Sequence, residues 1–239
     1  EILKPWLDRA IADPPLGVAG CHELEPPEEG SAYLITADPA GFGATGDKSA
    51  LTVWDAVERR EVAFWEDRES PDRFARRLIQ VQARYNQALV AVESNAAACI
   101  AVLNDIGCRN LLWTDRRHPG WYATNKRVQE AEARLVKMLY DNELAIVSRG
   151  MLHQLVNYDG SRKKRIKGLD GVTHHFDRAR TAVMAADILS RRHFNRVKLD
   201  EGAYTRIAGQ VTISDLDRLQ RVDKDAAKTP FKPPPRNWM

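Results

Sequence analysis

The chain has 239 residues and a mass of 27.0 kDa, with 44% hydrophobic and 29% charged residues, which suits a globular protein large enough to bury a core. No apolar run is long enough to span a bilayer, the N-terminus lacks the pattern of a signal peptide, and three scattered cysteines suit neither a disulfide framework nor a zinc site. We therefore expect a cytosolic protein with no membrane contact. The net charge of +3 divides into −5 over residues 1–30 and +8 over the remainder, and a basic body suits an anionic partner.

Composition separates both ends of the chain from its middle. Residues 1–30 are acidic and proline-containing, and we interpret them as a lead-in segment with one short helix. Residues 31–198 carry the regular apolar patterns of a folded domain. From residue 199 these patterns fade, and the chain ends in TPFKPPPRNWM, whose proline run cannot form a helix or an inner strand. We therefore predict an extended C-terminal tail over 199–239.

The predicted domain opens with three strand-like runs, Ala32–Ala37, Ala50–Val57 and Glu61–Glu66. A glycine-rich loop and a short charged turn join them, which predicts an antiparallel meander. A helix follows, with Ser70 as its N-cap and Pro71 at its first position.

Strands and helices then alternate along the chain. Short continuous apolar runs predict strands covered on both faces, and apolar residues at helical spacing predict helices. Three antiparallel strands followed by such crossovers give a mixed sheet flanked by helices, an α/β architecture with the element order of the ribonuclease H-like fold. The later elements are expected at Ala88–Val92 (strand), Ala96–Ile106 (helix), Asn110–Thr114 (strand), Asn125–Asp141 and Ser148–Asn157 (helices), with a final helix from near Asp177.

Three acidic residues fall at the ends of predicted elements. Asp38 follows the first strand and Glu93 follows the fourth, so both emerge at the carboxyl edge if these strands are parallel neighbours. Asp177 opens the last helix and can close the cluster. Each Asp also has a structural interpretation, since an Asp before proline forms turns and an Asp that opens a helix caps it. Asp187 lies about 15 Å further along that helix, so we prefer Asp177, with Asp47 as a looser candidate.

Three converging carboxylates need a positive charge between them. Carboxylate oxygens are hard ligands that suit Mg²⁺ or Mn²⁺. Two such ions about 4 Å apart activate a water and stabilise the leaving oxygen of a phosphodiester. The pattern therefore favours metal-dependent hydrolysis of nucleic acid.

At these positions the sequence resembles a known family. The series ADPAGFGATGDKSALTVWD, VAVESNAAA, GWYATNKRVQEAEARLVKMLYDNEL and HHFDRARTAVMAA, within residues 31–193, resembles the nuclease domain of the large terminase subunit of tailed bacteriophages. The resemblance implies that Asp38, Glu93 and Asp177 bind the catalytic metals. The chain departs from the family where His-Asp-Asp is often found before the last helix, because it has His175-Phe176-Asp177-Arg178 there.

The resemblance also implies an activity and a setting. It implies an endonuclease that cuts concatemeric double-stranded DNA during genome packaging, in the host cytoplasm and transiently at the procapsid. The implied partners are a packaging ATPase domain, a small terminase subunit and the portal. Large terminases carry that ATPase N-terminal to the nuclease, so we expect this chain to be an excised or separately encoded nuclease part.

Two basic segments are candidate DNA contacts. The run SRKKRIKG at 161–168 holds five basic residues and no acid, and it shortly precedes Asp177. It is either a solvated hairpin or a loop that contacts phosphates, and its position favours the second interpretation. A second patch surrounds WYATN, whose Trp121 and Tyr122 either stack on a base or, as we favour, pack under a loop. The candidate residues are Arg116, Arg117, Lys126, Arg127, Arg162, Lys163, Lys164, Arg165 and Lys167.

Five further residues have candidate supporting roles. Lys48 lies near the end of GFGATGDKS, which is not a phosphate-binding P-loop because an Asp interrupts the motif and a strand follows it. Ser94 and Asn95 either orient Glu93 or cap the next helix, and we favour capping. His174 and His175 stand beside Asp177 and could assist it.

Other functions suit parts of the same pattern. One alternative is a different nuclease of this fold, such as a junction resolvase, a transposase or an exonuclease. Another is a non-catalytic DNA-binding module of a packaging motor, and a third is an NTPase. A resolvase should prefer branched DNA, and an exonuclease should need free ends. A non-catalytic module should bind DNA without cleaving it, and nucleotide titration would reveal an NTPase.

Overall fold

A computed structural model describes residues 3–17, 20–40, 48–115, 117–158, 165–167, 173–190 and 211–212, the backbone alone being described for 165–167, 173–175 and 211–212. Its centre is a five-stranded mixed sheet in the order β1-β4-β3-β2-β5. The strands are β1 (His22–Glu23), β2 (Tyr33–Asp38), β3 (Ser49–Asp55), β4 (Arg60–Asp67) and β5 (Leu89–Val92).

The strand pairing confirms the predicted α/β architecture. β2 and β3 are antiparallel, β3 and β4 are antiparallel, and β5 returns parallel to β2. The crossover to β5 runs through α2 (Pro71–Arg84), whose N-cap Ser70 accepts a hydrogen bond from the Arg73 N–H and whose first residue is Pro71, as predicted.

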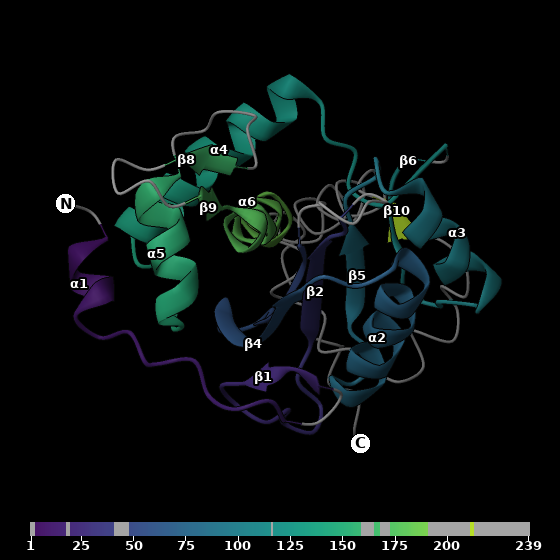
Figure 1. Ribbon diagram of the computed structural model, residues 1–239, viewed down its shortest axis with the longest axis horizontal. Helices are drawn as coiled ribbons and strands as arrows, with labels where there is room; N and C mark the ends of the chain where they lie inside the picture. The colour runs from purple at the N-terminus through teal and green to yellow at the C-terminus, as the bar shows by residue number, and fades with distance from the viewer. Residues whose placement is uncertain are drawn as a thin grey trace, which may run out of the picture.

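Helices cover both faces of the sheet (Figure 1). α2 and α3 (Ala97–Asp105) cover one face, and α6 (Asp177–Leu189), backed by α4 (Asn125–Tyr140) and α5 (Arg149–Asn157), covers the other. The alternation of side chains along β2 explains why there are two cores. Leu34 belongs to the core that contains α6, whereas Ile35 and Ala37 belong to the core that contains α2.

The sheet continues beyond β5. An isolated parallel bridge joins Val90 to Leu111, just before β6 (Leu112–Asp115), which matches the strand predicted at Asn110–Thr114. β6 pairs with β7 (His118–Pro119) and with β10 (Val211–Thr212).

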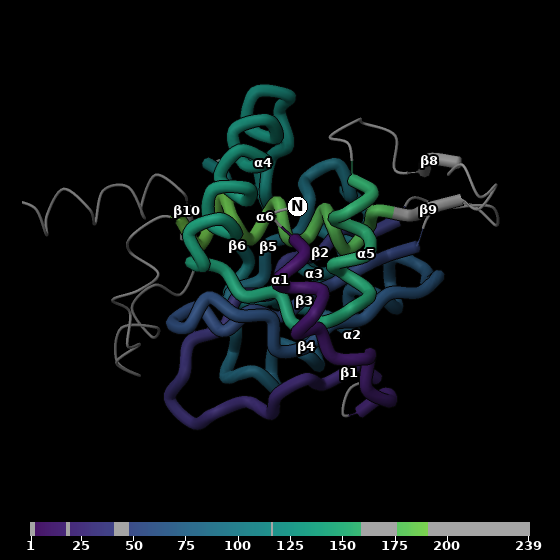
Figure 2. Tube along the Cα trace, turned by 90° about the vertical axis from the view of Figure 1, so that its left-hand side faces the viewer, coloured from purple at the N-terminus to yellow at the C-terminus, as the bar shows by residue number. Residues whose placement is uncertain are grey.

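The N-terminal segment lies against the body, as the purple trace in Figure 2 shows. It contains the predicted short helix, α1 (Lys4–Leu7), which contacts α5. Ile11 then pairs with Ser148 at the start of α5, and β1 extends the sheet beyond β4. The segment predicted as a lead-in therefore supplies the edge strand of the sheet.

A buried ion pair fastens α6 to β4. Arg178 Nη2 lies 3.1 Å from Glu61 Oε1, and the two side chains are 2% and 0% exposed. Glu61 also accepts hydrogen bonds from the Val147 and Ser148 N–H groups, at 3.0 and 2.9 Å. The Arg178 guanidinium lies over the Phe64 ring. One side-chain pair thus joins β4, α6 and the start of α5.

Among the described residues no helix combines the length and apolar character that a membrane span requires.

Candidate active site

Asp38 and Glu93 lie side by side at the carboxyl edge of the sheet. Asp38 is the last residue of β2, and Glu93 directly follows β5. The register pairs Ala37 with Val92, and the Glu93 N–H donates to the Ala37 carbonyl at 3.0 Å. The next residues along both strands, Asp38 and Glu93, are therefore neighbours, and both are buried, at 0% and 3% exposure.

Asp177 reaches the same face of the sheet through α6. It is the first residue of that helix and is fully buried. α6 packs on β2 and β3, where the hydroxyls of Thr181 and Thr52 lie 2.7 Å apart. Because Arg180, in the first turn of α6, contacts Glu93, the helix starts near this edge of the sheet.

Gln154 of α5 caps α6, a role that the sequence pattern does not reveal. Its Oε1 accepts hydrogen bonds from the N–H groups of Arg178 and Ala179, at 2.9 and 3.1 Å. Its Nε2 donates to both carboxylate oxygens of Glu66, at 3.2 and 3.1 Å. Gln154 thus supplies the cap that Phe176, the N-cap residue, does not provide with its side chain.

Glu66 adds a further carboxylate to this edge. The register aligns Asp38 with Ala50 and Ala50 with Glu66, so the three residues lie in one row across the strands. Directly opposed residues point to the same face of a sheet. Glu66 therefore faces the α6 side, where Gln154 holds it.

Arg180 places a basic group at this edge, and it was not among the residues that the sequence pattern indicated. Its Nη2 and Nε lie 3.2 and 3.4 Å from the two carboxylate oxygens of Glu93. Burial opposes the charged guanidinium, but the charge and hydrogen bond of Glu93, with smaller contributions from Tyr158 and Asp38, outweigh it and raise the pKa of Arg180. This side chain thus interacts with both paired carboxylates.

Asn95 also holds Glu93. Its Nδ2 donates to Glu93 Oε1 at 3.2 Å. The favoured interpretation, that Ser94 or Asn95 caps the next helix, is wrong, because α3 has Ala96 as its N-cap and no side-chain capping bond. Ser94 instead donates its backbone N–H to the Trp121 carbonyl.

Trp121 packs beneath the edge and does not offer its ring to a base. It is fully buried, and its Nε1 donates to Asp187 Oδ2 at 2.8 Å. The backbone before Trp121 can approach β5 closely because residue 120 is a glycine with φ at +81°. A side chain at Gly120 would collide with the Val92 carbonyl oxygen.

The Asp187 carboxylate is held by two arginines. These contacts indicate a structural role for Asp187 and so support the preference for Asp177 as the candidate metal ligand. Arg127 Nε lies 3.1 Å from Asp187 Oδ2, and Arg134 also pairs with this carboxylate. Arg127, one of the candidate DNA contacts, therefore directs its guanidinium into the protein. Lys126 and Arg117 of the same patch are exposed.

The remaining candidates are Lys48, Asp47, His174, His175 and the other residues of the basic segments. Lys48 is half-buried beside Ser49, whose hydroxyl accepts the Ala40 N–H at 2.9 Å. The backbone places β8 (Arg165–Lys167) antiparallel to β9 (Thr173–His175), so Arg165 and Lys167 lie opposite His175 and Thr173, and His174 lies opposite Ile166, in a ladder that leads into α6. Asp47, Arg116, Arg162, Lys163 and Lys164 lie outside the described residues.

The donor chemistry of the edge fits a hard divalent cation, since Asp38, Glu93 and Asp177 offer carboxylate oxygens. Within the part of the chain that the structure describes, no three His, Cys, Asp or Glu side chains are arranged closely enough to share a metal ion. In this arrangement Glu93 is engaged by Arg180.

The fold is similar to that of large terminase nuclease domains of known structure. The large terminase nuclease from the thermophilic phage G20c, solved with bound magnesium, superposes with a TM-score of 0.56 at 18% identity, covering 78% of this chain and 96% of that one. The nuclease domain of the large terminase of Thermus phage P74-26 gives a TM-score of 0.53 at 18% identity, covering 80% and 95%. The G20c nuclease has also been solved with cobalt and with zinc.

At the level of sequence, no family and no curated protein matches the chain. The likeness to the terminase nucleases is therefore a likeness of fold.

Proposed function

We propose that the chain is a metal-dependent endonuclease that hydrolyses phosphodiester bonds of double-stranded DNA during viral genome packaging. The observation that carries the proposal is the buried pair Asp38–Glu93 at the carboxyl edge, beneath the start of α6, in the fold of the large terminase nucleases. Under this proposal its partners are double-stranded DNA, a packaging ATPase domain, a small terminase subunit and the portal.

The proposed roles follow from the chemistry of the side chains. Asp38, Glu93 and Asp177 would hold Mg²⁺ or Mn²⁺ through their oxygens, with two ions as the proposed number. Bound there, the cations would activate a water and stabilise the leaving oxygen. Gln154 and Thr181 fix the start of α6 over the sheet, and Asn95 orients Glu93, so the chain itself supplies the rigid frame for this chemistry.

The first test is cleavage of supercoiled plasmid. We expect nicked and linear products with Mg²⁺ or Mn²⁺ and none with excess chelator, because the proposed site has only hard oxygen donors. Gel electrophoresis of time points measures the rate. Binding to DNA without cleavage under any metal condition would reject the enzyme and favour a non-catalytic module.

The same assay separates the other nucleases of this fold. A packaging endonuclease should cut closed circles and linear duplexes alike, because contacts to the backbone carry little sequence information. A strong preference for a four-way junction would favour a resolvase, and a requirement for free ends would favour an exonuclease.

Removal of charge from the basic run is expected to weaken DNA binding. The β8–β9 ladder leads directly into α6, which brings β8 next to the strand that precedes that helix. We expect the triple variant K163A/K164A/R165A to bind all duplex sequences more weakly, with a salt slope flatter by about one unit for each phosphate that the run no longer neutralises. Fluorescence anisotropy at several salt concentrations measures both quantities.

A charge-matched control removes three exposed basic residues elsewhere, in the variant K4A/R9A/K137A. If both triple variants change affinity and salt slope equally, the run 161–168 contributes only general charge, and the contact surface must be sought around Arg117 and Lys126.

A further inference from the structure

The Glu93 carboxylate is already occupied by a cationic partner from its own chain. Arg180 contacts both of its oxygens, at 3.2 and 3.4 Å, in a two-point arrangement that fixes the plane of the carboxylate. The Arg180 and Glu93 side chains are 18% and 4% exposed, so solvent screens the pair only weakly. The contact is therefore stronger than an ordinary surface ion pair.

Arg180 is held in position from several sides. It lies one helical turn after Asp177, and its guanidinium is 5.5 Å from the centre of the Trp121 ring. It also interacts with the Tyr158 hydroxyl, which in turn donates to Glu132 Oε1 at 2.6 Å. These contacts place a fixed positive charge beside Glu93 and within the electrostatic influence of Asp38.

A divalent cation needs the same oxygens. Arg180 occupies one lone pair on each Glu93 oxygen and fixes a positive charge beside them, so a metal on the same oxygens must compete with it, because two cations that share this buried edge repel each other. The two forms of the site are thus an arginine-held Glu93 without metal and a released Glu93 with metal.

We propose that Arg180 is a positioning residue that holds Glu93 in the metal-free protein and yields it when a divalent cation binds, so that Arg180 sets the metal affinity of the site. The proposal rests on the metal site described under the proposed function. Arg180 keeps the buried carboxylates compensated before metal arrives, and the displacement of its contact lowers the net gain from metal binding.

The test is a calorimetric titration of the full chain with MnCl₂ in the absence of DNA. We expect R180M to bind Mn²⁺ about tenfold more tightly than the unaltered protein, because the competing charge-assisted contact is gone. R180K keeps the charge, but its ammonium group cannot donate to both Glu93 oxygens in one plane. It should therefore also bind Mn²⁺ more tightly than the unaltered protein, but by a smaller factor than R180M.

The thermal midpoint gives a second readout. Without metal, R180M should have a lower Tm than the unaltered chain, since its buried carboxylates no longer have this partner. With saturating Mn²⁺ the deficit should shrink, because metal replaces the missing charge. If R180M does not fold, R180K carries the comparison.

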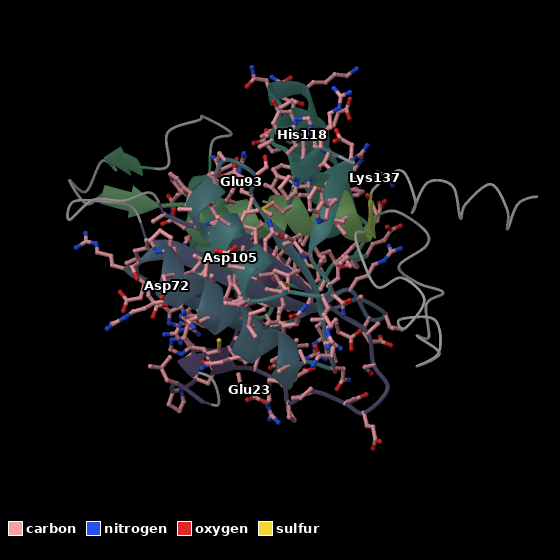
Figure 3. The ribbon with its side chains drawn as sticks, turned by 90° about the vertical axis from the view of Figure 1, so that its right-hand side faces the viewer. Glu23, Asp72, Glu93, Asp105, His118 and Lys137 are labelled. Atoms are coloured by element: carbon pink, nitrogen blue, oxygen red, sulfur yellow. The ribbon has the colours of Figure 1, made fainter. Side chains whose placement is uncertain are left out.

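The matched control is R84M, because Arg84 pairs with Glu23 at 2.9 Å in another partly exposed ion pair. Figure 3 shows Glu23 at the bottom of the view, well away from Glu93. R84M should leave Mn²⁺ affinity unchanged.

The outcomes separate the inference from the function on which it rests. Equal or weaker Mn²⁺ binding by R180M overturns the role of Arg180, even if plasmid cleavage requires metal. The role of Arg180 is also overturned if R180M binds Mn²⁺ more tightly but R180K binds it as the unaltered protein does. The charge of the side chain alone would then explain the effect. Absence of Mn²⁺ binding in every variant overturns the metal site itself.

Discussion

The D38N variant is expected to stop cleaving DNA while keeping its fold. Asparagine preserves the shape of the Asp38 side chain but removes the charge that the proposed metal site requires. Stabilisation of transition-state charge by metal is worth several kcal/mol, so we expect the cleavage rate to fall about a thousandfold or more. Plasmid cleavage measures the rate, and circular dichroism with thermal unfolding checks the fold.

The fold should survive because D38N removes one of two like charges that oppose each other at a buried edge. The matched control is D55N. Asp55 is also a buried aspartate that ends a strand of the same sheet, but it accepts hydrogen bonds from the Val57 and Glu58 N–H groups in the turn after β3. D55N should cleave normally, and a D38N protein that does the same would refute the assigned site.

The E61Q variant is expected to be strongly destabilising although the substitution is conservative. Glutamine nearly matches the shape of Glu61 but leaves the buried Arg178 guanidinium with Asp13, a half-exposed carboxylate 3.4 Å from its Nη1, in place of its buried countercharge. Removal of one partner from a buried pair costs about 3–5 kcal/mol, which is a large part of the free energy of unfolding of a typical domain. Urea denaturation followed by circular dichroism measures this decrease.

An exposed pair provides the comparison. Glu143 pairs with Arg59 at 3.2 Å, but its side chain is 50% exposed. The E143Q variant should reduce the free energy of unfolding by less than about 1 kcal/mol. If E61Q and E143Q reduce the free energy of unfolding by similar amounts, the buried Arg178–Glu61 pair contributes no more to stability than the exposed pair does.

Local patterns in the sequence were sufficient to predict four of the five strands of the sheet and the position of two carboxylates. Alternating and continuous apolar runs predicted β2 to β5, and Ser70 with Pro71 predicted the start of α2. The positions of Asp38 and Glu93 then followed from one assumption, that the first and fourth predicted strands are parallel neighbours, which the register confirms.

The partners of these carboxylates were not predictable in the same way. Arg180 reaches Glu93 only because α6 docks on the sheet with one particular rotation, and Gln154 reaches Glu66 only because α5 packs beside the start of α6. Such contacts depend on tertiary packing and leave no local periodicity. The pairing of β1 with β4 was missed for a related reason, since two residues are too short for a strand pattern.

The docking of α6 on β3 also has a kinetic consequence. Thr181 and Thr52 meet across 129 positions of sequence, whereas β2, β3 and β4 follow one another directly in the chain. A contact between distant positions requires a large loss of chain entropy to close the loop before any packing energy is gained. Such contacts therefore form late in folding. On a ribosome the meander can pair long before α6 has been synthesised. A nascent chain that carries Asp38 and Glu93 but not yet Asp177 therefore lacks one of the three proposed metal ligands until α6 has been synthesised.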